Sequence, residues 1–468
     1  MAFYSRLTPG LEQRLTAAID EMLPAQMASL KELIRFESVK QPPKNGMPFG
    51  EEMQRALSYT LALCETFGLQ TRDLEGYVGV AEHGSGKETL GILAHLDVVP
   101  AGDGWSIGPF SGEIKDGRLY GRGALDDKGP LLSAVYALAA IIRLEIPLSH
   151  KVQLIFGCDE ESGWACMDRF KRTEPMPDIA FSPDAEYPLV YSERAIVQAT
   201  FRARTHGSKL SIHSGERANV VPGTAYAIVP KDIAVPASFA SPGEGFTIEV
   251  LPEADGTRIA VTGFSAHASM PEKGKNALQC LLALLCELPL PCHDKLIVRT
   301  LHNAFLMDMH GETLGVDTLD HSGRLTLNIG MLHFDGEHAD ITVDARSPET
   351  LLPEVLLSTI SSALNPAGFV LHNSRIQGGH FVPEESPLVQ RLMQVYRAQT
   401  GDHESQPLAI GGGTYARAIP MAVAFGCEFP DEEALVHMPN EYIPLNDIKR
   451  NTYIMADAIL ALAGYAGA

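Results

Sequence analysis

The sequence predicts an α/β fold in which a mostly parallel sheet, flanked by helices, carries a large inserted α+β domain. Helical and strand patterns alternate in the first third of the chain and again near its end, as in a parallel sheet covered by helices. The middle instead shows the period-2 alternation of half-exposed strands. A length of 468 residues fits two domains, because a single core rarely grows past about 250–300 residues.

Residues 1–186 are predicted to form the first part of the outer domain. Apolar residues at helical spacing indicate helices at 29–36, 51–67 and 130–142. Short apolar runs, typical of buried strands, lie at 90–94, 152–156 and 179–181. These helices and strands alternate in the order expected of a parallel sheet.

The insertion is predicted to cover residues 187–379. Alternating patterns indicate strands at 196–204, 247–250, 258–262, 325–329 and 341–345, and helical stretches lie at 276–287 and 353–364. Residues 380–468 return to the first pattern, with a helix at 387–399, a strand at 421–425 and a helix at 448–462. The segments 1–186 and 380–468 are therefore expected to form one discontinuous domain.

The composition restricts the classes of partner. With 37 basic and 58 acidic side chains the net charge is −21, which argues against nucleic acid and against an anionic membrane surface. The longest uncharged apolar stretch, 129–142, is too short to span a bilayer, and the start of the chain lacks the pattern of a signal peptide. Seven cysteines without a CxxC spacing favour reduced thiols, so we expect a cytoplasmic protein.

Acidic and His-bearing clusters stand where the predicted strands end. They are AHLDVVP (94–100), GRGALDDKGP (121–130), GCDEESG (157–163), SPDAEYP (182–188) and, after the last strand, HMPNE (437–441). Ligands of open α/β sheets collect at the carboxyl ends of strands, so these loops are expected to converge. Three carboxylates and two imidazoles are a plausible ligand set for two dications, because the carboxylates and a bridging hydroxide balance their charge. Mixed His and carboxylate ligation suits Zn²⁺ best, with Mn²⁺ or Co²⁺ as alternatives.

Each cluster also has an ordinary structural interpretation. His95 alone is more often a core histidine, Asp126 and Asp127 are suited to capping a helix, and 159–161 resembles a solvated turn. Asp184, before a proline, is commonly a turn residue, and His437 depends on its place in the chain order alone. Together and in this order, coincidence is a poor explanation.

HLD, GRGALDDKG, DEESG, SPDAE and a late His resemble the co-catalytic dizinc metallopeptidases. That family includes aminoacylase, the carboxypeptidase that cleaves glutamate from folate, succinyl-diaminopimelate desuccinylase and the Xaa-His dipeptidases. Within it, SPDAEYP, GGGTYAR (411–417) and the long insertion look most like the dipeptidase V enzymes of lactic-acid bacteria. The resemblance implies a zinc-peptidase-like catalytic domain (1–186 and 380–468) with an inserted lid domain (187–379).

The resemblance also implies a role for each motif residue. Asp126 would bridge two Zn²⁺ ions, Asp97 would orient an imidazole, and Glu160 would be the general base. It further implies a cis peptide bond between Asp126 and Asp127. The implied metal ligands are His95, Asp126, Glu161, Asp184 and His437.

The insertion carries further candidates by the same resemblance. His267, in GFSAHASMPEKGKNA, would donate a hydrogen bond to the developing oxyanion. Asn219 would help to hold the substrate, and Arg346 would clamp its C-terminal carboxylate. The backbone N–H groups of Gly411, Gly412 and Gly413 could bind the same carboxylate, or the glycines could simply form a tight turn. Since the long insertion could supply the lid His within one chain, we expect a monomer, with a dimer as the alternative.

The expected function is that of a dinuclear-zinc dipeptidase, which attacks small unblocked dipeptides with a metal-bridging hydroxide and a Glu general base. One alternative is an N-acyl-amino-acid hydrolase of the deacylase or desuccinylase type on the same site. Another is a non-catalytic metal-binding scaffold. This alternative is disfavoured because Glu160 would ligate no metal, and a site without catalysis would have no need of its carboxylate.

Overall fold

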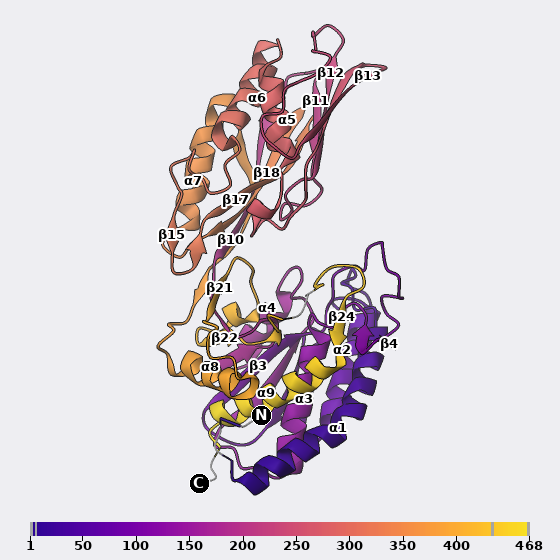
Figure 1. The fold of residues 1–468 in the computed structure, drawn as a ribbon, viewed down its shortest axis with the longest axis vertical. Coiled ribbons are helices and arrows are strands. Elements are labelled where there is room, and N and C mark those ends of the chain that lie inside the picture. The colour runs from indigo at the N-terminus through magenta and orange to yellow at the C-terminus, as the bar shows by residue number, and fades with distance from the viewer. Residues whose placement is uncertain (1–2, 5–6, 432–434, 466–468) are drawn as a thin grey trace. The chain divides into compact units, whose positions relative to one another are not determined.

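The computed structural model describes residues 3–4, 7–431 and 435–465, which fall into two units (Figure 1). The first unit runs up to Tyr191 and also contains Val382–Leu408 and the chain from Thr414 onward. The second contains Ser192–Phe381 and Ala409–Gly413. The glycine run at 411–413 therefore belongs to the second unit, although the sequence analysis assigned it to the last outer segment.

The first unit is built on a sheet whose centre is parallel. The first six strands in the order of this sheet are β1 (Gln70–Asp73), β2 (Val78–His83), β6 (Lys151–Gly157), β3 (Thr89–His95), β7 (Ile179–Ser182) and β22 (Ala422–Ala424). The pairs β6–β3, β3–β7 and β7–β22 are parallel, whereas β1–β2 and β2–β6 are antiparallel. Strands β3, β6 and β7 therefore end at the same edge, as the alternating pattern predicts.

Helices cover this sheet. They are α1 (Pro9–Arg35), α2 (Glu51–Thr66), α3 (Lys128–Arg143), α4 (Ala165–Thr173), α8 (Pro387–Thr400) and α9 (Leu445–Leu462). Helix α3 is buried from Lys128 to Ile141 because it contacts β3 and packs against α1 and α9, which are far apart in sequence (Figure 1). Among the described helices, none has the length and apolar character needed to cross a membrane.

The second unit is an antiparallel sheet with helices on one face (Figure 1). Its strands are ordered β13 (Thr247–Glu253), β14 (Gly256–Thr262), β12 (Thr224–Pro230), β11 (Ser211–Ser214), β17 (Thr326–Phe334), β18 (His338–Ser347), β10 (Ala195–Arg204) and β19 (Val370–Gln377). Burial alternates along β10, so one side of the sheet is apolar. That side packs in one core with α5 (Ala277–Cys286), α6 (Cys292–Phe305) and α7 (Pro353–Leu364).

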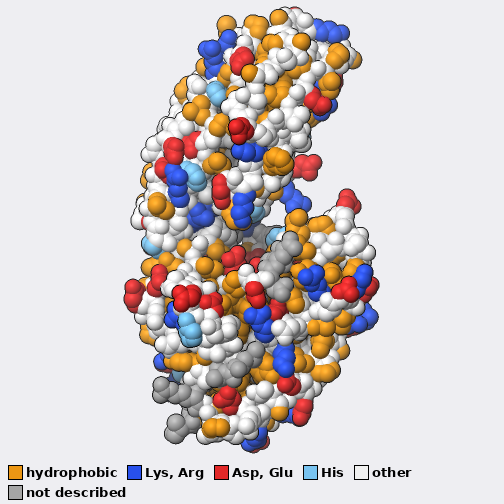
Figure 2. Space-filling view, in the orientation of Figure 1, with side chains coloured by type: hydrophobic (Ala, Val, Ile, Leu, Met, Phe, Trp, Pro, Cys, Tyr) orange, Lys and Arg blue, Asp and Glu red, His pale blue; other side chains and the backbone are white. Residues whose placement is uncertain are grey.

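Short elements complete the description. One small sheet contains β24 (Tyr442–Pro444), β5 (Arg118–Tyr120) and β4 (Glu113–Lys115). A second pairs β23 (Cys427–Glu428) with β8 (Ala185–Glu186). A hairpin is formed by β15 (Leu319–Asp320) and β16 (Gly323–Arg324). The other elements are β9 (Val190–Glu193), β20 (His380–Phe381), β21 (Leu408–Ile410), η1 (Pro271–Lys273), η2 (Asn365–Ala367) and η3 (Tyr415–Ala418). On the face drawn in Figure 2, Asp and Glu side chains are spread over both units with Lys and Arg among them.

A charged network at the antiparallel edge of the first sheet gives a pH-dependent contribution to stability. Glu82 on β2 accepts hydrogen bonds from Arg72 Nη1 (2.6 Å), Lys151 Nζ (3.0 Å) and Gln153 Nε2 (2.8 Å). The hydrogen bond from Arg72 outweighs burial and lowers the pKa of Glu82 from 4.5 to about 2. The ionised form is thus favoured in the folded state, and the contribution is fully present only above pH 4.5.

We expect Glu82→Gln to lower the free energy of unfolding at neutral pH by about 1–3 kcal/mol, the usual range for a hydrogen-bonded charge. The difference between variant and wild type should shrink as the pH falls from about 4.5 to about 2, where folded Glu82 takes up its proton. Denaturant unfolding at several pH values measures this. Glu113→Gln, at an exposed position on β4, is the control, and a Glu82→Gln deficit that is independent of pH would contradict the prediction.

Candidate metal centre

Five predicted ligand residues come from five segments of the first unit. His95 is the last residue of β3, and Glu161 and Asp184 follow β6 and β7. Asp126 precedes α3, and His437 lies in the loop between β23 and β24. Because the parallel strands end at one edge, the loops that follow them meet there.

The carboxylate of Asp126 lies between two imidazoles. His95 Nε2 is 2.9 Å from Asp126 Oδ1, and His437 Nε2 is 2.9 Å from Asp126 Oδ2. On the first side Asp184 Oδ2 lies 3.5 Å from His95 Nε2, and on the second Glu161 Oε1 lies 3.1 Å from His437 Nε2. The structure therefore brings all five side chains together in two groups that share Asp126. Donor atoms of His95, Asp126 and Glu161 lie within 4.8 Å of one another.

The crowding of charge shifts the pKa values of these groups. Burial, with the nearby Asp126 carboxylate, raises the pKa of Asp184 to about 7. Burial opposes protonation of His95, but the carboxylates of Asp184 and Asp126 outweigh it and raise the pKa of this imidazole well above its usual value. Carboxylates crowded in this way are stabilised by cations between them, and the mixed donor set fits Zn²⁺, Mn²⁺ or Co²⁺.

Asp97 acts through its main chain as well as its side chain. Its carbonyl oxygen is 2.8 Å from His95 Nδ1, which directs Nε2 of the same ring toward Asp126. Its carboxylate is 3.7 Å from His95 Nδ1 and instead accepts the backbone N–H groups of Glu160 (3.0 Å) and Glu161 (2.9 Å). The carbonyl of Asp97 thus orients the imidazole, whereas its carboxylate fixes the Glu160–Glu161 turn.

Glu160 differs from its acidic neighbours Asp159 and Glu161, whose carboxylates contact Lys40 and His437. Within the described part of the chain no hydrogen bond to its carboxylate is found. Burial raises the pKa of Glu160 well above its usual value, with His95 opposing and the carboxylates of Asp184 and Glu161 adding to the rise. A raised pKa suits a group that must take up a proton and give it back.

The peptide bond between Asp126 and Asp127 is cis, as predicted, and Tyr187–Pro188 and Gly426–Cys427 are cis as well. Asp127 occupies the N-cap position of α3, but its side chain makes no capping hydrogen bond. Its carboxylate instead accepts the backbone N–H of His95 at 2.9 Å. The helix-cap interpretation of this acidic pair therefore does not apply, and Asp127 connects the Asp126 loop to β3.

Glu441 supports the Asp126 loop in a way that local sequence patterns did not reveal. Its buried carboxylate accepts backbone N–H groups of Gly123 (3.0 Å), Leu125 (3.0 Å) and Asp126 (3.3 Å). Arg122 Nη1 donates to its other oxygen at 2.6 Å. These partners are more than 300 residues away in the sequence, so no local pattern could predict the contact. The motif HMPNE indicated only that a further polar residue, Glu441, follows His437.

We expect Glu441→Ala to lower the free energy of unfolding by about 3–5 kcal/mol, because it leaves Arg122 buried without its counter-ion. Urea denaturation followed by circular dichroism measures this. Arg122→Ala combined with Glu441→Ala should cost clearly less than the sum of the two single changes. Strictly additive effects would contradict the pairing.

The other predicted substrate residues lie in the second unit. Asn219 and His267 stand on adjoining segments, since Val220 and His267 form a β-bridge and Ala268 N donates to Asn219 O at 2.9 Å. His267 is exposed, and its Nδ1 is 2.7 Å from Ser269 Oγ. The structure thus brings these two side-chain positions together.

Arg346 is less free than the sequence suggested. Its Nε and Nη2 donate to Asp344 (2.8 and 3.2 Å), and Nη1 donates to Gly411 O at 2.9 Å. A guanidinium has five N–H groups, so two, one on each terminal nitrogen, have no hydrogen-bond partner among the described residues. Gly411 is packed closely, because a Cβ there would lie 2.5 Å from Nη2 of Arg194, a neighbour that the sequence analysis did not single out.

A parallel sheet whose strand ends gather His and carboxylate donors around one shared carboxylate is suited to metal-dependent hydrolysis. Sequence comparison gives the family: the chain matches Peptidase family M20/M25/M40 over residues 91–461. The chain belongs to this family, and it is a peptide-bond hydrolase. The resemblance that the motifs indicated is thereby confirmed.

Relatives agree with this assignment, and solved structures share the fold. The chain is 37% identical over 451 residues to “Putative dipeptidase YtjP” of Bacillus subtilis, covering 92% of this chain and 96% of the relative. It is 36% identical over 455 residues to a Staphylococcus epidermidis protein named “Putative dipeptidase”, with the same coverage. The fold resembles human carnosine dipeptidase 1 (TM-score 0.60, 19% identity, 98% and 100% of the two chains) and the dipeptidase Dug1p of Saccharomyces cerevisiae (0.61, 15%, 97% and 99%).

Proposed function

We propose that this chain is a dinuclear-zinc dipeptidase that hydrolyses the peptide bond of small unblocked dipeptides. The observation that carries the proposal is the Asp126 carboxylate, which presents one oxygen to His95 and the other to His437. One ion would be held by His95, Asp126 and Asp184, and the other by Asp126, Glu161 and His437. The relatives named as dipeptidases support the choice of substrate class.

Two bound ions would supply Lewis acidity, which lowers the pKa of water and polarises the scissile carbonyl. The chain's own contribution to proton transfer is Glu160. It takes a proton from the attacking water and delivers it to the leaving amine, so the carboxylate returns to its starting state. Asp97 fixes the position of Glu160 through its hydrogen bond to the Glu160 N–H.

Residues of the second unit would bind the substrate. In this proposal His267 donates a hydrogen bond to the developing oxyanion, and Asn219 holds the peptide. The two remaining N–H groups of Arg346 bind the C-terminal carboxylate, with the backbone N–H groups of Gly411, Gly412 and Gly413 nearby. We further propose that the enzyme acts as a monomer in the cytoplasm.

A substrate panel tests this function directly. Ala-His and Leu-Gly should be cleaved by the Zn²⁺-loaded protein, N-acetyl-amino acids should be cleaved far more slowly, and a chelator should remove the activity. Preference for the N-acetylated substrates would show an N-acyl-amino-acid hydrolase instead. Hydrolysis of neither class by fully metal-loaded protein would favour the scaffold alternative.

A further inference from the structure

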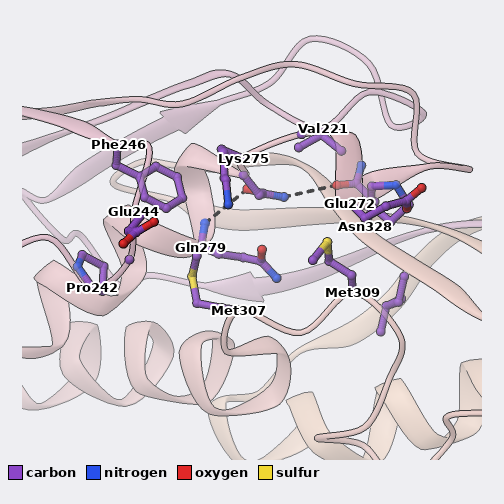
Figure 3. A pocket seen from close by; sticks show the side chains of 15 residues that line it. Val221, Pro242, Glu244, Phe246, Glu272, Lys275, Gln279, Met307, Met309 and Asn328 are labelled. Atoms are coloured by element: carbon purple, nitrogen blue, oxygen red, sulfur yellow. Dashed lines mark hydrogen bonds between the residues drawn. The ribbon is translucent and has the colours of Figure 1, made fainter.

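A cavity of about 230 Å³ lies within the second unit, on the side of the sheet that carries α5 (Figure 3). Its apolar walls include Val221, Phe246, Met307, Met309 and Leu327. In Figure 3, Phe246 and Val221 lie on one side of it and the two methionines on the other. The volume exceeds the roughly 150 Å³ that holds a benzene molecule and falls below the roughly 300–1,000 Å³ of pockets for drug-sized ligands. The cavity therefore suits a ligand of the size of one amino acid.

Three charged side chains line the cavity, all of them exposed, and one of the three is a cation. Lys275 lines it, and no described acidic side chain forms an ion pair with this lysine. Its stem lies against Gly245, where a Cβ would be 3.4 Å from the Lys275 Cε. Glu244 and Glu272 also line the cavity and are exposed. A zwitterion with an apolar side chain would complement one cation, two carboxylates and apolar walls.

The amide side chains that line the cavity are held by hydrogen bonds within the protein, and Gln279 Nε2 donates to Asp308 O at 3.0 Å. Asn276 Nδ2 donates to Asn328 Oδ1 (3.2 Å) and Ile329 O (3.0 Å), and its Oδ1 accepts the N–H groups of Leu278 and Gln279. Asn328 Nδ2 donates to the carbonyls of Ala218 (3.1 Å) and Val220 (3.0 Å). These buried amides form a rigid wall, so the charged groups at Lys275, Glu244 and Glu272 are left to select a ligand.

We propose that this cavity binds a free amino acid with an apolar side chain. The side chain lies between Phe246 and the methionines, the carboxylate pairs with Lys275, and the ammonium group faces Glu244 and Glu272. The Met side chains adapt to ligands of different shape, so leucine, methionine and phenylalanine are all accepted. Glycine lacks the apolar group and binds poorly.

The cavity is built from the segments that carry Asn219 and His267. Val221 lies two residues after Asn219, and its N–H donates to Ala266 O at 2.8 Å. The side-chain amide of Asn328 donates hydrogen bonds to the carbonyls of Ala218 and Val220, the neighbours of Asn219. Pro271 and Gly274, which line the cavity, follow shortly after His267. This step rests on the proposed function, in which Asn219 and His267 contact substrate. We infer that binding of the amino acid changes KM, so that the enzyme responds to the concentration of its own hydrolysis product.

Methionine methyl signals test binding without any reference to turnover. In metal-loaded protein labelled with ¹³C-methyl methionine, the Met307 and Met309 signals are assigned with Met307→Leu and Met309→Leu. Millimolar L-leucine should shift both signals, and Lys275→Gln should weaken this binding about tenfold, as expected for loss of a charge-assisted contact. Lys273→Gln is the matched control, because this neighbouring exposed lysine does not line the cavity.

Three results would overturn the binding proposal: unmoved signals, equal affinity in Lys275→Gln and wild type, or isocaproate, which lacks the ammonium group, binding as tightly as L-leucine.

The regulatory part has its own readout. L-leucine should change the KM for a dipeptide more in wild type than in Lys275→Gln, since product binding at the metal centre is common to both proteins. Equal changes in the two proteins would overturn that part while leaving the binding result intact.

Discussion

Glu160→Gln is expected to lower kcat by about 10²–10⁴-fold, the usual contribution of a general acid–base group. The reason is that glutamine keeps the size of the side chain but cannot take a proton from water. Metal content should be unchanged, because Glu160 is not among the five converging donors. Steady-state kinetics and elemental analysis of the same preparation measure both quantities.

The control for this variant is Glu145→Gln. Glu145 is an exposed glutamate of the same unit, and its replacement should leave kcat and metal content at wild-type values. Near-normal turnover of Glu160→Gln would show that another group is the base. Loss of metal in Glu160→Gln would instead place this residue among the ligands.

Asp126→Asn is expected to remove both ions and to lower kcat/KM by at least about 10³-fold, equivalent to about 4 kcal/mol. A carboxamide lacks the charge of the carboxylate and offers one oxygen where the structure places two, each 2.9 Å from a different imidazole. Metal analysis after dialysis at equal free Zn²⁺, with kinetics on the same samples, gives the result.

Single-side variants separate a shared ligand from an ordinary one. His437→Gln and Asp184→Asn each change one group of donors, so each protein should keep about one ion per chain under the conditions that strip Asp126→Asn. If Asp126→Asn also keeps one ion, Asp126 belongs to one site only. The dinuclear proposal would then need a different bridging residue.

Much of the site follows from local patterns. Apolar runs followed by HLD, DEESG and SPDAE predicted strands β3, β6 and β7 with polar loops at one edge, and the structure has that arrangement. The prediction succeeds because parallel strands are buried on both faces and leave a strong apolar signal. The family motifs then identified Asp126 and His437 as candidate ligands of the same site. Hydrophobic periodicity alone gives no reason to expect these two residues to lie close together.

Other features left no local signal. Strand β19 is nearly all exposed, so it lacks the alternation that revealed β10, and it was missed. The pairing of Glu441 with Arg122 and the N–H groups of the Asp126 loop joins residues more than 300 positions apart. Arg346 donates hydrogen bonds to Asp344, two residues earlier in β18. This contact depends on the direction of the Arg346 side chain, which sequence spacing does not specify.

The attachment of the Asp126 loop to Glu441 has a consequence for synthesis of the protein. A growing chain presents β3, β6 and β7, with their acidic loops, long before the ribosome has added His437 and Glu441. Until then the loop at Gly123 to Asp126 lacks the carboxylate that accepts its N–H groups. On the proposed function, a nascent chain is therefore expected to hydrolyse peptides only after the segment with His437 and Glu441 has folded onto this loop.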